Sequence, residues 1–388
     1  MRRRRIQTEW IGLEAITLHS LETSRVDPAA ILLQPDHVIL GQITELIHAQ
    51  GGTPVGMFKR FGAVPNYTIC LPVKNEEAVL PATLAALHAS MSKAGLPGLV
   101  VFLLNDTVDQ SAAMIKAWTK RFAISFVLAQ VRFADRGSAP RARRIALQVG
   151  QVLAPGAPLL TTDADTCVAP GWVARSLYHL NQGTDLVCGQ VDVHPEELAA
   201  LPLGVRRCGE VEAAYTAAVR QLWQHWTGAA APDPLLSAMG ASLAVRSAAL
   251  RAVGGLPLPP VGEDRVLAQL MAERGFRVAE ATDVRVTTSL RLHGRAWGGV
   301  SDTLRQRAAE PDPLCDEKLR PVRAMHALAG RWNMLAGLPD ARPRFARLLR
   351  PLAAGRRLRL SQVECELQVA NALLQHTGGL VGQAVAAE

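Results

Sequence analysis

The chain has 388 residues, of which 49% are hydrophobic and 20% are charged. This composition excludes a disordered or fibrous protein and predicts a packed core, either one large α/β unit with appendages or two modest domains. The net charge of +8 suits an anionic partner, and charge alone leaves a nucleotide diphosphate, a phospholipid surface and a nucleic acid open.

The first regular pattern begins at residue 67, where short apolar runs alternate with amphipathic stretches. This alternation is typical of an α/β fold in which helices cover a mostly parallel sheet. Each apolar run is too short for a buried helix and is bounded by polar or turn residues, which indicates strands. The predicted strands cover residues 67–73, 99–104, 124–128 and 158–162. A helix is predicted at 76–93, where apolar residues recur at helical spacing and acidic residues occupy the first turn.

A second set of elements follows residue 165 and adds a further layer to the first set. The predicted helices cover residues 171–180 and 263–274, and a long helical stretch ends near residue 226. The further predicted strands cover residues 185–193, 239–245, 276–279 and 284–287. Residues 1–65 and 310–388 lack this regularity, apart from helical patterns at 345–349 and 364–374.

Cysteine spacing and the amino-terminal segment bear on the compartment of the protein. The six cysteines are widely spaced and form no Cys-x-x-Cys pair, so the pattern indicates reduced, mostly buried thiols rather than zinc ligands or a redox couple. The arginines at 2–5 resemble the start of a signal peptide, but polar residues follow them. No apolar run reaches the ~18 residues of a membrane span. We therefore expect a soluble, cytoplasmic protein.

Two carboxylates, Asp163 and Asp165, directly follow the predicted strand at 158–162 and are separated by the small Ala164. At the carboxyl end of a strand in an open α/β sheet, side chains project into the crevice where ligands bind. Two hard oxygen ligands there suit Mg²⁺ or Mn²⁺, which keeps open positions for the oxygens of a diphosphate. The alternative is a solvated turn, because Asp-x-Asp occurs by chance in many loops.

A second carboxylate pair, Glu263 and Asp264, opens the predicted helix at 263–274. Acidic residues in a first turn stabilise the helix dipole, which is by itself a sufficient reason for them. However, a group transfer from a diphosphate donor to a hydroxyl needs a base for the hydroxyl proton and a separate cation for the leaving diphosphate. Two carboxylate sites with separate tasks match that requirement.

The order of these motifs resembles the family 2 glycosyltransferases of the GT-A fold, from about residue 66 to residue 302. The resemblance implies an enzyme that takes a sugar from a nucleotide-diphosphate donor. The resemblance divides the chain into an N-terminal extension at 1–65, a GT-A-like catalytic domain at 66–305 and a helical C-terminal appendage at 306–388. Within the catalytic domain, it implies a nucleotide-sugar half at 66–190 and an acceptor half at 191–305.

The resemblance places the donor nucleotide near the first two strands. The opening strand and turn, with the sequence Pro-Val-Lys-Asn-Glu, imply that Pro72, Asn75 and Glu76 border the nucleotide base. The acidic turn after the second strand implies further base contacts from Asn105 and Asp106. Asn105 stands where an Asp is frequent in the family.

Two arginines follow a Gly-rich segment that resembles the family's Ala-Arg-Asn helix start, and Arg144 occupies the usual Asn position. Independently of the family, Arg143 and Arg144 near a helix N-terminus can clamp an anion such as the donor diphosphate. Solvated helix arginines are an equal alternative.

The resemblance also assigns separate roles to the two carboxylate pairs. Asp163 and Asp165 match the metal-binding Asp-x-Asp of the family, with Mg²⁺ or Mn²⁺ as the cofactor. Asp264 matches the catalytic base, and Glu263 is its neighbour. The implied reaction is a direct displacement that inverts the anomeric configuration.

The downstream segment separates the chain from one branch of the family. Processive polysaccharide synthases carry a Gln-x-x-Arg-Trp motif and membrane helices, whereas this chain reads His-Gly-Arg-Ala-Trp at 293–297. The departure implies a single-addition enzyme. His293 is a candidate metal ligand or donor contact and Arg295 a candidate diphosphate contact, with an ordinary structural His as the alternative.

Two other functions stay open on the sequence, a nucleotidyltransferase that makes a nucleotide sugar and a non-catalytic nucleotide-sugar-binding protein. The first is disfavoured because the opening strand lacks a Gly-rich, Arg-containing loop for a triphosphate, and the second because a pure binder has no need of a base. The expected partners are a nucleotide-diphospho-sugar donor and a glycan, lipid-linked or small-molecule acceptor, without nucleic acid. Peripheral membrane contact through the arginines at 2–5 and the Arg-rich stretch at 342–359 stays open.

Overall fold

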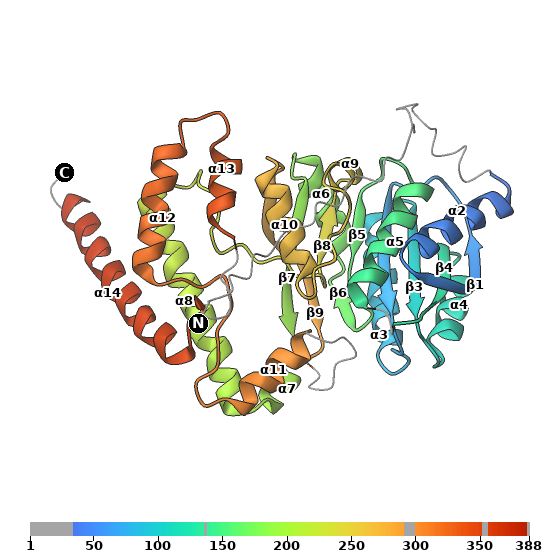
Figure 1. Cartoon of the computed structure of the whole chain (residues 1–388), viewed down its shortest axis with the longest axis horizontal. Coiled ribbons are helices and arrows are strands. Elements are labelled where there is room, and N and C mark those ends of the chain that lie inside the picture. Colours follow the sequence, from blue (N-terminus) through green and yellow to red (C-terminus); the bar gives the residue numbers. More distant parts are fainter. Residues whose placement is uncertain (1–33, 136–137, 291–298, 351–355, 386–388) are drawn as a thin grey trace, which may run out of the picture.

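The structure is a computed structural model that describes residues 34–135, 138–290, 299–350 and 356–385. Within these residues its centre is a nine-stranded sheet with the order β1-β4-β3-β2-β5-β8-β7-β9-β6 (Figure 1). The strands are β1 (Gly52–Arg60), β2 (Tyr67–Val73), β3 (Gly98–Asn105), β4 (Ser125–Phe133), β5 (Leu159–Thr161), β6 (Thr166–Val168), β7 (Leu186–Val193), β8 (Leu243–Val245) and β9 (Val278–Thr288).

The middle of the sheet is parallel and its direction changes farther out. All of β2 is buried, as expected for a parallel strand that is covered on both faces. β2 runs parallel to β3 and β5, and β3 runs parallel to β4. β8 runs against both β5 and β7, and the edge strands β1 and β6 run against β4 and β9. The predicted α/β class is confirmed, and the sheet is more mixed than the alternation of elements predicted.

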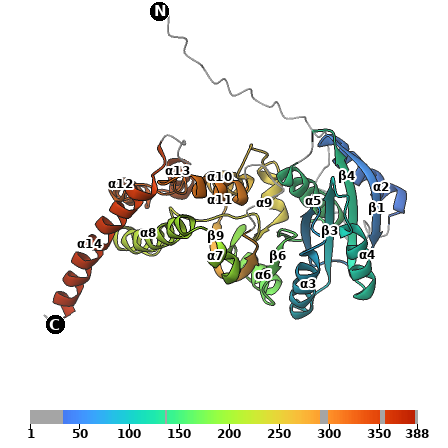
Figure 2. The same ribbon diagram turned by 90° about the horizontal axis from the view of Figure 1, so that it is seen from below.

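Helices cover both faces of the sheet (Figures 1 and 2). One face carries α2 (Asp36–Ala49), α5 (Ala139–Leu153), α9 (Ser247–Ala252) and α10 (Glu263–Glu273). The other face carries α3 (Leu80–Ala94), α4 (Ser111–Arg121) and α6 (Trp172–Asn181). The packing follows from helical periodicity: Ile39, Ile43 and Ile47 of α2 are fully buried because a spacing of four places them on one stripe of the helix.

A helical unit stands beside the sheet, at the left of Figure 1. It contains α8 (Leu203–Thr227), α12 (Val322–Leu335), α13 (Ala341–Leu348) and α14 (Leu360–Val385), while α7 (Pro195–Ala200) and α11 (Val300–Ala309) lie near the start of α8. Its own buried cluster includes Tyr215, Trp223, Trp332 and Phe345. Among the described helices, none combines the length and the apolar character needed to cross a membrane.

Most predicted elements occur close to their predicted positions. The strands predicted at 67–73 and 185–193 are β2 and β7, and the helices predicted at 171–180 and 263–274 are α6 and α10. The helix expected from residue 76 begins later, at Leu80, because residues 76–79 form a turn whose amides bond back to Glu76.

Two expectations about regularity were wrong. The strands predicted at 276–279 and 284–287 are parts of one strand, β9, which begins at Val278 and whose register with β7 shifts between Gly189 and Gln190. The amino-terminal region is also regular from residue 36, because α2 and β1 join the sheet through β4. The division of the chain at residues 65, 190 and 305 stays a prediction.

Candidate active site

The Asp163 turn lies at the carboxyl end of β5, beside the central strand β2. The Thr161 hydroxyl donates to the Cys70 carbonyl at 2.8 Å, and the Thr83 hydroxyl of α3 donates to the Ala164 carbonyl at 2.9 Å. These two bonds fix the backbone on each side of Asp163. The predicted Asp-x-Asp turn is therefore held in place at the carboxyl end of β5.

Arg143 bridges the two carboxylate pairs that lie far apart in the sequence. Its guanidinium donates one hydrogen bond to Asp163 and another to Glu263, which is 120 positions away. The Arg143 side chain is 5% exposed, whereas the Asp163 side chain is 35% exposed. α5 presents this arginine early in the helix, after Ser138 caps the amide of Arg141 at 3.3 Å.

The charges around Arg143 compensate one another inside the protein. Burial lowers the pKa of the Arg143 guanidinium, but the carboxylates of Asp163, Glu263 and Asp264 outweigh burial and leave that pKa raised. Burial also raises the pKa of Glu263, although Arg143 opposes this effect. Removing one partner from such a buried group of charges destabilises the protein, because the remaining charge is left without compensation.

Asp264 is held by backbone amides at the start of α10. Its Oδ2 accepts from the Gly240 amide at 2.7 Å, and its Oδ1 accepts from the Arg265 amide at 2.7 Å. The helix begins after Gly262, whose φ of 79° is in the left-handed region that favours glycine. These contacts fix the orientation of the Asp264 carboxylate beside the Arg143 bridge.

Gly240 is a site residue whose role the sequence did not reveal. A Cβ at this position would lie 2.7 Å from Arg143 Cζ, so any side chain would displace the guanidinium. The neighbouring Ser242 accepts a hydrogen bond from the Trp172 indole at 3.0 Å and ties this segment to α6. The sequence had placed Gly240 inside a predicted strand at 239–245, whereas β8 begins only at Leu243.

A pocket of about 340 Å³ opens at the carboxyl ends of β2, β3 and β4. Asp106 lines it, together with Lys74, Thr107 and Arg132. Asp106 Oδ1 accepts from the Phe133 amide at 2.9 Å, while its Oδ2 is buried without a hydrogen-bond partner. An orphaned buried acceptor in a pocket suits a ligand that donates an N–H or O–H. The sequence had suggested Asp106 but neither Lys74 nor Arg132.

The other residues predicted to border the base lie near this pocket, where they are buried or form hydrogen bonds within the protein. Asn75 has a φ of 52°, and its Oδ1 accepts from the Val108 amide at 2.9 Å, which shapes the loop after β3. Pro72 lies within the fully buried β2. Glu76 and Asn105 are also buried, 8% and 2% exposed. None of these four lines the pocket.

The structure separates Arg144 from the carboxylates. Arg144 Nη1 donates to the Leu256 carbonyl at 2.7 Å, and burial lowers the pKa of Arg144. Successive residues of a helix point about 100° apart, so only Arg143 of the pair faces Asp163. His293 and Arg295 lie outside the described residues.

The two aspartates fit a hard divalent cation by the chemistry of their donor atoms. Asp163 and Asp165 are half-buried carboxylates on either side of the buried Ala164, at a sheet edge. Mg²⁺ and Mn²⁺ prefer such oxygen ligands. Asp163 Oδ1 already accepts from Arg143, so a bound cation would share that carboxylate with the guanidinium.

Residues 68–229 match the family model Glycosyl transferase family 2. This segment is therefore similar to the family 2 glycosyltransferases, and the match supports a glycosyltransferase. The matched region includes the Asp106 pocket, Arg143 and the Asp163 turn. No curated protein is significantly similar in sequence.

Several solved structures resemble the chain at low identity. A mannosyltransferase from Pyrobaculum calidifontis in complex with GDP-Man and Mn²⁺ is 18% identical, with a TM-score of 0.45, over 91% of this chain and 90% of that chain. TarS 1–349 from S. aureus in complex with UDP is 11% identical, with a TM-score of 0.42, over 80% and 91%. Glucosyl-3-phosphoglycerate synthase from Mycobacterium tuberculosis, with Mn²⁺, UDP and phosphoglyceric acid, is 14% identical, with a TM-score of 0.36, over 71% and 82%. All three TM-scores are below 0.5.

Proposed function

We propose that this protein is a glycosyltransferase that moves a sugar from a nucleotide-diphosphate donor to an acceptor hydroxyl, in a single, inverting and metal-dependent addition. The observation that carries the proposal is the bridge from Arg143 to Asp163 and Glu263. The bridge brings the turn that suits a cation next to the helix start that carries Asp264, the candidate base. Direct displacement needs both groups at one centre.

The donor nucleotide binds at the carboxyl edge of β2, β3 and β5 in this proposal. Asp106 accepts a hydrogen bond from the base, since this residue lines the pocket and its Oδ2 lacks a protein partner. Asp163 and Asp165 hold Mg²⁺ or Mn²⁺, which when bound supplies positive charge for the leaving diphosphate. Arg143 acts as a positioning residue, because it fixes Asp163 from inside the protein.

Asp264 takes the proton of the acceptor hydroxyl. Its two oxygens each accept a backbone N–H, from Gly240 and Arg265, so the carboxylate has a fixed orientation before the acceptor arrives. The hydroxyl oxygen then attacks the anomeric carbon from the face opposite the leaving diphosphate, which inverts that carbon.

The experiment compares Asp264→Asn with wild type. The amide keeps the size of the carboxylate but accepts no proton, so we expect unchanged donor affinity and a transfer rate lower by about 10²- to 10⁴-fold. Donors are found by a thermal-shift screen of nucleotide diphosphate sugars with Mn²⁺, since a ligand of the native state raises its apparent stability. Transfer is then followed as nucleotide diphosphate release with a panel of hydroxyl acceptors.

Glu273→Gln is the matched control, because Glu273 is an acidic residue at the other end of α10. We expect wild-type transfer from this variant. A chelator should weaken donor binding to wild type and leave the Asp163→Asn/Asp165→Asn protein unaffected. Full transfer by Asp264→Asn would remove that residue from the role of base.

A further inference from the structure

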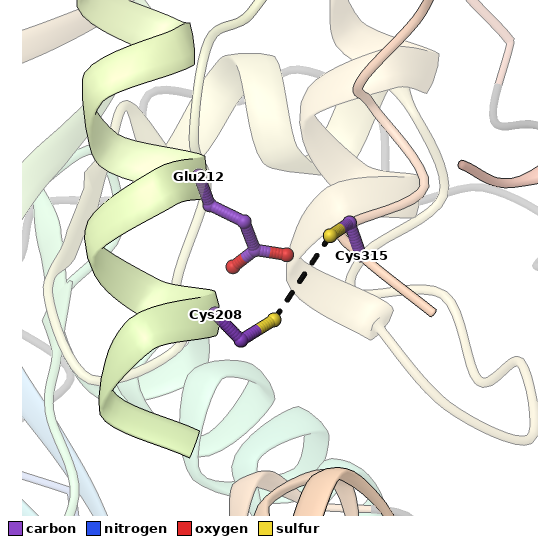
Figure 3. Close-up of side chains that lie close together, drawn as sticks. All are labelled: Cys208, Glu212 and Cys315. Carbon is purple, nitrogen blue, oxygen red and sulfur yellow. Dashed lines mark hydrogen bonds between the residues drawn. The ribbon is translucent and has the colours of Figure 1, made fainter. Parts of the chain in front are cut away.

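Two cysteines and a glutamate converge inside the helical unit (Figure 3), and both cysteines belong to the buried cluster of that unit. Cys208 and Glu212 lie one turn apart on α8, and Cys315 lies between α11 and α12. Both cysteines are fully buried. Within the described part of the chain, this is the one group of three His, Cys, Asp or Glu side chains whose ligand atoms all lie within 4.8 Å of one another.

The spacing of the sulfurs is that of two ligands on one tetrahedral ion. Cys208 Sγ and Cys315 Sγ are 3.9 Å apart. With Zn–S bonds of about 2.3 Å and a tetrahedral angle, two thiolates on one zinc ion lie about 3.8 Å apart. The spacing of Cys208 and Glu212 also places both side chains on the same face of α8.

The surroundings of Glu212 provide the support that a metal-binding carboxylate needs. Glu212 Oε1 accepts from Arg307 Nη2 at 2.6 Å and from the Asp316 amide at 2.7 Å. Both bonds fall on Oε1, which leaves Oε2 for an ion. The Arg357 guanidinium also donates to the Cys315 carbonyl, at 2.8 Å from Nε, and fixes the segment that carries this cysteine. Such outer hydrogen bonds orient ligands in known metal sites.

We propose that Cys208, Glu212 and Cys315 bind a zinc ion that joins α8 to the segment between α11 and α12, with a water completing four ligands. The two thiols release two protons as the ion binds, so the local net charge does not change. Two thiolates, one carboxylate and Zn²⁺ carry a net charge of −1, which Arg307 balances. Soft thiolate ligands select zinc over the Mg²⁺ or Mn²⁺ that suits Asp163 and Asp165.

The test measures zinc in the full-length protein, purified with a reductant and dialysed after incubation with Zn²⁺. We expect about one tightly held zinc ion per chain in wild type, and loss of that ion in Cys208→Ser and Cys315→Ser. Cys365→Ser is the matched control, because Cys365 is the exposed cysteine of α14 and should leave the zinc content unchanged. Asp163→Asn should also keep the zinc, which separates this site from the proposed donor cation.

A second measurement does not depend on whether the variants fold. Co²⁺ in place of Zn²⁺ gives a thiolate-to-cobalt absorption band in the near ultraviolet, and wild type should show this band at one equivalent of Co²⁺. Wild-type protein that takes up neither ion, or equal zinc content in Cys208→Ser and wild type, would overturn the proposal. Two fewer free thiols in unreduced, denatured protein would also overturn it, because Cys208 and Cys315 would then form a disulfide.

Discussion

Replacing Arg143 by methionine tests the bridge on which the candidate active site depends. The substitution keeps most of the side-chain volume and removes the cation from between Asp163 and Glu263. Breaking a buried ion pair by removing one partner costs about 3–5 kcal/mol, because the other charge stays buried without compensation. The Glu263 side chain is 11% exposed and the Asp163 side chain 35% exposed, so Asp163 regains hydration and Glu263 does not. We therefore expect the lower end, a loss of about 3 kcal/mol in the free energy of unfolding.

Differential scanning calorimetry measures this loss as a fall in Tm of about 6 °C, at about 2 °C per kcal/mol for a large domain. Arg144→Met is the matched control, since that arginine is the next residue of α5 and bonds one backbone carbonyl at Leu256. Arg144→Met should lower the free energy of unfolding by about 1 kcal/mol. In Arg143→Met/Glu263→Gln no buried carboxylate is left at 263, so the double variant should recover part of the Tm. Equal losses at 143 and 144, together with no recovery in the double variant, would refute the reasoning.

Three further predictions concern the Arg143 bridge and the Asp106 pocket. Gly240→Ala should destabilise the protein by about 1–3 kcal/mol and impair donor binding, because the added Cβ would lie 2.7 Å from Arg143 Cζ. Gly330→Ala in α12 is the control and should not destabilise the protein, because a Cβ added there meets no atom of another element within 4 Å. Asp106→Asn should weaken nucleotide binding by about tenfold in calorimetric titration without changing Tm, and unaltered affinity would exclude the base contact. Burial raises the pKa of Glu263 in the folded state above its ordinary value of 4.5. As the pH rises from 4.5 through that raised pKa, wild type should therefore lose stability relative to Glu263→Gln. Urea unfolding of both proteins at several pH values measures this difference, and a gain in the relative stability of wild type over the same range would contradict it.

The sequence predicted elements well where one strong pattern decides the structure. β2 is a mostly apolar run bounded by polar residues, and its burial inside the sheet follows from its composition. β7 is buried only over its first four residues, where its sequence is apolar, and it is half-buried where Gln190 and Asp192 follow. β9 was divided in two because exposed Thr282 and Asp283 interrupt its apolar pattern at the register shift. β1 gave no signal, since Pro54 and Gly56 disfavour a strand, yet both are tolerated in an edge strand that pairs only with β4.

The sequence by itself determined which kinds of side chain lie at the carboxyl ends of the strands, because carboxylates that follow an apolar strand must lie where that strand ends. Only the tertiary structure decided which of them meet. That Arg143 rather than Arg144 faces Asp163 depends on the rotation of α5 against the sheet, and that Gly240 must lack a side chain depends on how closely its backbone approaches the guanidinium. Contacts such as Arg143 with Glu263, or Cys208 with Cys315, join residues more than a hundred positions apart. Local periodicity carries no information about such pairs, since packing of whole elements creates them.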